Sequence, residues 1–136
     1  VCNDPAPTTG LEAKFSYRMT AAMALAGRDT GDPATFSAAA CAEPALVRLR
    51  ERIDVVGDRA LPETAAQVDV TARGGATTRL VHDIDMPLPP ERLRRRLEAK
   101  AGALAGAERA ATLAAATLAD VPDIAEVGRL LREAPA

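Results

Sequence analysis

The spacing of the apolar residues changes twice along the chain, and this change limits the fold more than any other feature. From residues 11 to 53, apolar side chains recur every three or four positions, which is the period of a helix with one buried face. From residues 55 to 84 they alternate with polar side chains, as in strands buried on one face. After residue 90 the helical period returns. The order of helices, a small antiparallel sheet and helices predicts the α+β class.

The first part of the chain predicts an extended lead-in followed by three helices. Residues 1–10 are rich in proline and threonine and predict the lead-in. The first helix is expected to begin at Leu11 and to end at Gly27. Its apolar stripe consists of Phe15, Met19, Ala22 and Ala26.

Two further helix starts carry proline in the first turn. Asp32 and Pro33 predict the cap and first turn of a short second helix that buries Phe36. Pro44 opens the third helix. The inner stripe of this third helix is expected to be Leu46, Leu49 and Ile53.

The alternating segment predicts a sheet that contains a β-hairpin. Val55 and Val56 are expected to end a short first strand. Residues 67–73 and 79–84 alternate around Gly74 and Gly75, a pair that suits a tight turn, so they predict two antiparallel strands. The returning strand ends at a group of prolines, Pro87, Pro89 and Pro90.

Three helices are expected after the prolines. The first is a long helix with an inner stripe of Leu93, Leu97, Ala101 and Leu104 and with basic residues on its outer face. The second is an Ala-rich helix over Glu108–Leu118. The last is capped by Asp123. Its inner residues are expected to be Ile124, Val127, Leu130 and Leu131.

Length, charge and composition favour one domain over residues 1–136 and exclude several classes of partner. The net charge of -2 gives no general attraction to nucleic acid or to an anionic membrane, and the three aromatic residues leave little for base stacking. No window is long and apolar enough for a transmembrane helix. Cys2 and Cys41 form no metal-ligand or disulfide pattern, so a reducing cytoplasm is the expected compartment.

The residues that could perform chemistry are few. His82 is the only histidine, and its position between Leu80 and Ile84 favours a partly buried structural role. Asp83 and Asp85 share a strand face but lack further oxygen ligands, so no metal site is predicted. The arginines of residues 92–96 scatter around a helix and favour a solvated face over a phosphate-binding patch. No catalytic residue is therefore assigned.

The strongest candidate site lies near the start of the first predicted helix. Lys14, Ser16, Tyr17 and Arg18 combine two cations with two hydroxyl groups. Free backbone N–H groups at a helix start would add to their attraction for a carboxylate. The alternative is an ordinary polar helix start without a ligand.

At these residues the sequence resembles the opening of the C-terminal domain of the MmgE/PrpD family. That family includes 2-methylcitrate dehydratase and cis-aconitate decarboxylase. The likeness covers nearly the whole chain, and the segment around Lys14 is its most specific part. The matching segments are Cys2-Asn3, Pro7–Ser16, the Ala-rich helix that follows, Glu43–Val47, Ile53–Val56, Val68–Gly75 and Leu97–Lys100.

The resemblance implies a cofactor-independent lyase or isomerase for small polycarboxylates, built from a large helical domain and a smaller α+β lid. This chain resembles only the lid, so it is expected to be inactive without the helical domain. Lys14 and Ser16 match the family motif and are expected to line the cleft and hold a substrate carboxylate. Met19 stands where relatives commonly place a tyrosine, so standard family chemistry is not carried over. Tyr17 could replace that tyrosine only in a shifted register.

Two function hypotheses follow. In the first, the chain is the lid of such a lyase, and its partner is a helical domain of the same chain or of another. In the second, it is a non-catalytic ligand-binding or protein-interaction module that kept the fold. The start at Val1 leaves open whether the sequence is part of a longer polypeptide. Under the first hypothesis an exposed apolar contact face of Ala, Leu and Met is expected, and self-association into a homodimer would hide it.

Overall fold

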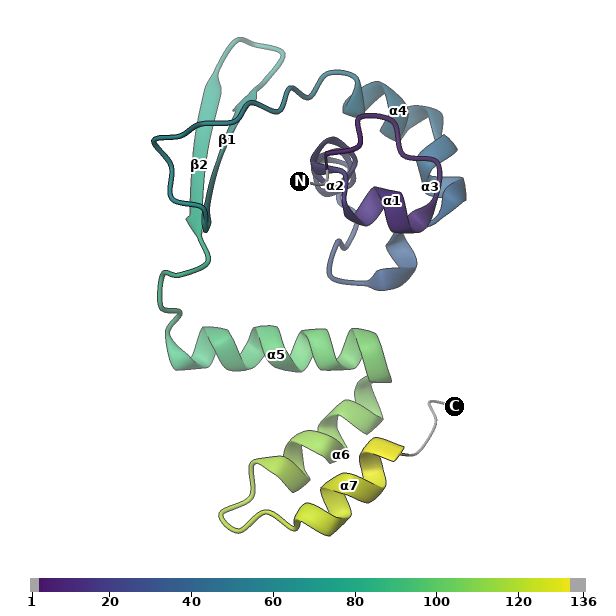
Figure 1. Cartoon of the computed structure of the whole chain (residues 1–136), viewed down its shortest axis with the longest axis vertical. Coiled ribbons are helices and arrows are strands. Elements are labelled where there is room, and N and C mark those ends of the chain that lie inside the picture. Colours follow the sequence, from purple (N-terminus) through teal and green to yellow (C-terminus); the bar gives the residue numbers. More distant parts are fainter. Residues whose placement is uncertain (1–2, 133–136) are drawn as a thin grey trace. The chain divides into compact units, whose positions relative to one another are not determined.

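A computed structural model describes residues 3–132. In this part of the chain, helices precede and follow the two strands of an antiparallel sheet, and this order of elements confirms the α+β class (Figure 1). The chain divides into two compact units. We call Val1–Val55 with Arg94–Ala136 the helical unit and Val56–Leu93 the hairpin unit. A single domain over residues 1–136 stays a prediction, and the two units are described separately.

The first predicted helix is two helices. Helix α1 covers Gly10–Lys14 and α2 covers Tyr17–Leu25, so the prediction of one continuous helix was wrong. The chain breaks at Phe15 and Ser16 because the Ser16 hydroxyl accepts the N–H of Met19 and caps a new helix.

The break also changes which residues face the core. Met19 and Ala22 are fully buried, as predicted, and Met23 is buried beside them. Phe15 is 53% exposed and Ala26 is exposed as well, so these two do not belong to the buried stripe. The break places Phe15 outside α2 and out of line with its buried face, whereas Ala26 is the C-cap of α2 and is exposed where the helix ends.

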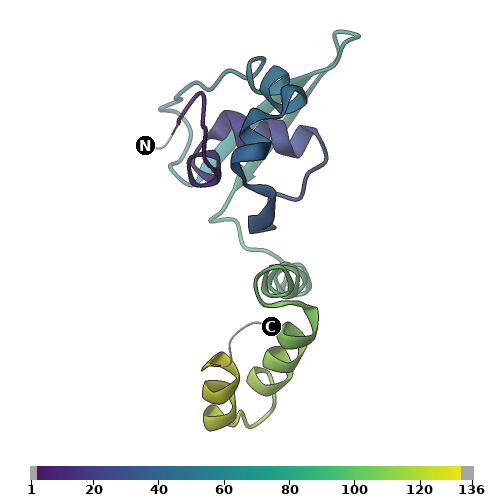
Figure 2. The same ribbon diagram turned by 90° about the vertical axis from the view of Figure 1, so that its right-hand side faces the viewer.

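Three short elements complete this part of the helical unit: the 3-10 turn η1 (Pro33–Thr35), α3 (Ala38–Ala42) and α4 (Pro44–Arg50). The second predicted helix is thus a single 3-10 turn, capped by Asp32 as expected, and Phe36 behind it is half-buried. Helix α4 begins at Pro44 as predicted. Together with α1 and α2, these elements gather in one group (Figure 2). Their shared core consists of Ala13, Met19, Met23, Cys41 and Leu46, with Phe36 and Ala40 packed against it.

The described part of the lead-in, residues 3–9, forms neither helix nor strand but is fixed to α1 and α2. Pro7 is buried. The Glu12 carboxylate accepts the backbone N–H groups of Thr8 and Thr9 at 2.8 and 2.9 Å, while the Thr9 hydroxyl caps α1. These contacts form a capping box that holds the lead-in at the start of α1.

The C-terminal helices are α5 (Pro90–Ala105), α6 (Ala107–Thr117) and α7 (Ile124–Arg132). All three were predicted. Helix α5 has no buried residue, so its leucine stripe is not covered as expected. In α7 only Leu130 is buried, whereas Ile124 and Leu131 are exposed, because α6 packs against one side of α7 and does not cover these two residues.

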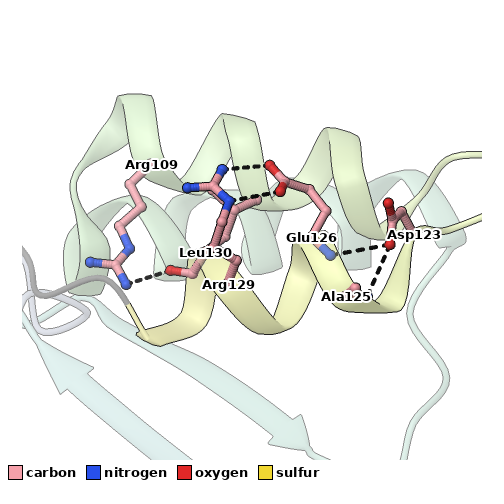
Figure 3. Close-up of polar contacts among 6 residues, drawn as sticks. All are labelled: Arg109, Asp123, Ala125, Glu126, Arg129 and Leu130. Carbon is pink, nitrogen blue, oxygen red and sulfur yellow. Dashed lines mark hydrogen bonds and ion pairs between the residues drawn. The ribbon is translucent and has the colours of Figure 1, made fainter.

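A side chain of α6 fixes the end of α7. The Arg109 Nη2 atom donates to the Leu130 carbonyl oxygen at 2.8 Å (Figure 3). At the start of α7 the Asp123 carboxylate accepts the N–H of Ala125, which confirms the predicted cap (Figure 3). An arginine at a helix C-terminus satisfies carbonyls that have no partner within the helix, so α6 and α7 are paired by polar as well as apolar contacts.

In the hairpin unit, β1 (Ala65–Thr71) pairs antiparallel with β2 (Thr77–Asp83), which confirms the predicted hairpin. Val68 lies opposite Leu80. At the turn Gly75 has φ +84° and donates to the Ala72 carbonyl. Only glycine adopts this conformation without strain, and it gives the short loop its geometry.

Two predictions about the sheet were wrong. Val55 and Val56 form no strand. The strands are also not buried on one face, since Leu80 is 59% exposed and no residue of Val56–Leu93 is buried. Alternation in the sequence produces one apolar face, but within the hairpin unit no second layer covers it.

Candidate carboxylate-binding site

The break between α1 and α2 positions the four predicted site residues. Lys14 is the last residue of α1, Ser16 is the N-cap of α2, and Tyr17 and Arg18 are its first two residues. Lys14 is exposed and Tyr17 is 56% exposed, whereas Ser16 is only 1% exposed. The four residues therefore divide into one buried hydroxyl and three side chains that reach solvent.

Ser16 has a structural role in this arrangement. Its hydroxyl donates to the Asp4 carbonyl and accepts the Met19 N–H at 3.2 Å. The only proton of the hydroxyl is thus used inside the protein, and a substrate carboxylate could not receive it without breaking the contact with the lead-in. Ser16 places its neighbours in space and is itself out of reach of a ligand in this structure.

Lys14 borders a pocket of the helical unit. Its Nζ lies 5.9 Å from the centre of the Phe36 ring, within the range of a cation–π contact. Within residues 3–132, Lys14 forms no ion pair. The pocket is lined by Lys14, Thr20, Thr30, Gly31, Pro33, Phe36 and Lys100. No acidic side chain lines it, so its charged groups are both cations.

Arg18 lies near the carboxylate of Asp54 and does not line this pocket. Its Nη2 lies 3.8 Å from Asp54 Oδ1, which is a long ion pair, and its Nε is buried without a hydrogen-bond partner. Tyr17 does not line the pocket either. The structure therefore brings Lys14 together with two threonines and a second lysine, and not with Tyr17 or Arg18.

Sequence reasoning missed Thr20, Thr30, Phe36 and Lys100 as members of this pocket. Thr20 lies on α2, where its hydroxyl donates to the Ala13 carbonyl at 3.3 Å. Lys100 lies on α5, and its Nζ donates to the Gly31 carbonyl at 3.1 Å. A helical wheel places Thr20 one turn after Tyr17, but no local pattern joins Lys100 to a residue that lies 86 positions earlier.

The other titratable candidates lie outside this pocket. His82 is exposed on β2, so the prediction that it is partly buried was wrong for the same reason as for the rest of the sheet. The Asp83 carboxylate accepts the Asp85 N–H at 3.0 Å, and this bond, with help from Thr64, lowers the pKa of Asp83. Among residues 3–132, no three His, Cys, Asp or Glu side chains gather in a way that could hold a metal ion.

Cys41 is free and buried in the core of the helical unit, where its Sγ lies 3.4 Å from the Thr9 carbonyl oxygen. Burial raises the pKa of its thiol, and the nearby negative charge of Glu12 raises it further. Cys41 therefore behaves as a core residue rather than as a nucleophile. Cys2 lies outside the described residues.

Comparison of the chain with models of protein families, with curated proteins and with solved structures finds no match. Across the described part of the chain, no helix combines the length and apolar character needed to cross a membrane. The candidate site is consequently argued from its own chemistry.

Proposed function

We propose that this chain is the lid of a substrate cleft in an MmgE/PrpD-like lyase for small polycarboxylates. We also propose that it is inactive without the large helical domain of such an enzyme, which is distinct from the helical unit defined above. One observation supports the proposal above all others. Lys14, within the segment that resembles the family motif, borders a pocket without any acidic lining residue. A carboxylate is the ligand that such a pocket favours.

The physical argument concerns charge that is not neutralised. An ammonium group with no carboxylate partner attracts an anion, and the attraction is stronger beside apolar walls, which lower the local dielectric constant. Phe36 and Pro33 supply such walls next to Lys14, and Thr30 supplies a hydroxyl group, whereas the proton of the Thr20 hydroxyl is used by the Ala13 carbonyl. Charge and hydroxyl groups together suit a carboxylate better than a neutral ligand.

Inactivity of the isolated chain follows from the positions of its acid and base groups. Elimination of water or carbon dioxide next to a carboxylate needs a base and an acid within reach of the substrate. None of the residues lining the pocket is a histidine, aspartate or glutamate, and His82 lies in the hairpin unit. The proton-transfer groups are therefore expected from the helical domain.

Turnover measurements test this proposal. The chain alone should not convert 2-methylcitrate or cis-aconitate, and adding the helical domain encoded by the same or a neighbouring reading frame should produce turnover. Conversion at an enzyme-like rate by the isolated chain would overturn the proposal. The proposal would also be overturned if the complete reading frame encoded no helical domain and the chain bound neither compound.

Binding measurements test the role of Lys14. Lys14→Ala should weaken polycarboxylate binding by about fivefold or more, because one charged contact is lost. Arg73→Ala, which removes an exposed cation from the hairpin loop, is the matched control and should leave affinity unchanged. Calorimetry that finds equal affinity for Lys14→Ala and the parent would remove Lys14 from the site.

The second candidate function is a non-catalytic binding module, and the position of Met19 favours it. Met19 is fully buried in the core and so supplies no group to a cleft where relatives place a tyrosine. The exposed leucines of α5 and the apolar face of the hairpin would then be contact surfaces for a partner or a second copy. Polycarboxylate binding without turnover, even with the helical domain present, would favour this function over the first.

A further inference from the structure

We infer that Lys14 and Lys100 form a two-point anchor for a ligand with two carboxylates, one ammonium for each. This inference rests on the proposed function and names the residue that binds a second carboxylate of the ligand, which the proposed function leaves open. It assigns a binding role to α5, a helix that carries no other part of the site. The inference depends on the lysines, on what surrounds each of them and on the charge of the pocket.

The choice of lysine at these two positions is unusual for this chain. Of its 17 basic residues only two are lysines, and both line the same pocket. Arginine serves at every other basic position, including four positions of α5 itself. Lysine carries a compact charge at the end of a flexible stem, so it can adjust its position to a small ligand without the fixed planar geometry of a guanidinium.

Each ammonium is held by contacts that leave its charge uncompensated. Lys100 Nζ donates to the Gly31 carbonyl at 3.1 Å, and an ammonium has two further N–H donors. Lys14 Nζ lies over the Phe36 ring at 5.9 Å. A carbonyl dipole and an aromatic face orient the two lysines without neutralising them.

The acidic residues closest in sequence to the pocket are engaged elsewhere. Asp29 Oδ1 accepts the Gly31 N–H at 2.8 Å, and Asp32 Oδ1 accepts the Ala34 N–H at 2.9 Å. Both carboxylates stabilise the loop that leads into η1, and neither lines the pocket. The pocket thus keeps two positive charges, although the chain as a whole carries -2. A ligand with two negative charges would balance the two positive charges of the pocket.

The two lysines allow a direct test by NMR. A chain labelled with carbon-13 at the lysine ε positions should show two side-chain signals, because it contains two lysines. Lys14→Arg and Lys100→Arg assign the signals. Titration with glutarate should shift both signals along one binding curve. Pentanoate has the same chain length but only one carboxylate. Its affinity should be lower than that of glutarate by about fivefold or more.

Substitution separates charge from structure at Lys100. Lys100→Gln keeps an N–H donor on a slightly shorter side chain but lacks the charge, so it should weaken glutarate binding about fivefold. Lys100→Arg should restore most of the affinity. Arg95→Ala, which removes a cation from the same helix outside the pocket lining, should bind glutarate as the parent does.

The outcomes distinguish this inference from the proposed function. If glutarate shifts only the Lys14 signal, or if glutarate and pentanoate bind equally well, the two-point anchor is wrong and the carboxylate site at Lys14 stands. If Lys100→Gln binds glutarate like the parent, Lys100 is likewise excluded. If neither lysine signal responds to glutarate or citrate, both proposals are overturned.

Discussion

At the scale of single residues, short polar side chains determine where the helices of the N-terminal segment begin. Thr9, Ser16 and Ser37 each accept a backbone N–H from the first turn of a helix. Ser16 differs from the other two because it is buried and also donates to the Asp4 carbonyl. One hydroxyl thus starts α2 and holds the lead-in.

Ser16→Ala tests this double role. We expect the substitution to lower the free energy of unfolding by about 2 kcal/mol, because it removes a helix cap and leaves the Asp4 carbonyl without its donor. Ser37→Ala removes only a cap and should cost about 1 kcal/mol. Urea unfolding of the two variants gives the comparison. Equal losses would mean that the contact with Asp4 adds nothing to stability.

Glu12 should make the stability of the helical unit dependent on pH. Hydrogen bonds from the Thr8 N–H, the Thr8 hydroxyl and the Thr9 N–H lower the pKa of Glu12 below its usual value of 4.5. A lowered pKa in the folded state means that the contribution is complete above the pKa of the unfolded chain and is lost as the pH falls through the folded value.

Thermal unfolding of Glu12→Gln checks this dependence. The melting temperature of the parent should exceed that of the variant at pH 7, and the difference should shrink as the pH is lowered below 4.5. Asp69 and Glu126 also have lowered pKa values, so both proteins should lose stability in acid, but the parent should lose more. A difference that stays constant from pH 7 to acid would show that Glu12 acts without its charge.

At the scale of elements, the hairpin depends on the conformation of one turn residue. Gly75→Ala should destabilise the hairpin by about 1 kcal/mol, because φ is +84° there and a side chain makes that conformation unfavourable. Gly74→Ala is the matched control, since Gly74 has no positive φ and an added methyl group meets open space. Amide exchange across β1 and β2 should be faster only in Gly75→Ala. Equal exchange in both variants would contradict the assigned turn.

The elements that could be predicted from the sequence are those with a local cause. The hairpin follows from alternation around Gly74 and Gly75. The start of α4 follows from proline in its first turn, and the start of α7 follows from its aspartate cap. The break between α1 and α2 was missed, although Ser16 is a common N-cap residue, because the apolar spacing runs through it without interruption.

Contacts between distant residues had no local signal. The bond from Arg109 to the Leu130 carbonyl and the meeting of Lys14 with Lys100 in one pocket depend on how helices pair. Alternation likewise shows which face of a strand is apolar but not whether another layer covers that face. For this reason the predicted burial of His82 and Leu80 was wrong. Of the candidate site, Lys14 was predicted, and its pocket was not.

At the scale of the whole molecule, the buried side chains are distributed very unevenly. The largest fully buried ones, among them Met19, Met23 and Leu46, belong to the segment that contains α1 to α4. The hairpin unit has no buried residue, and a two-stranded hairpin is marginally stable in water on its own. Stability of the isolated chain should therefore reside in the α1 to α4 core.

A pair of leucine substitutions tests this distribution. Leu46→Ala should lower the free energy of unfolding by about 2–5 kcal/mol, because Leu46 is 1% exposed and its removal leaves a cavity in the core. Leu80→Ala should change it by less than about 1 kcal/mol, since Leu80 is largely in water already. Chemical unfolding of both variants measures the contrast. Equal costs would show that the hairpin face is covered in the isolated chain. If the helical domain covers that face, adding it should raise the cost of Leu80→Ala and leave that of Leu46→Ala unchanged, because only the surface leucine would gain a new contact.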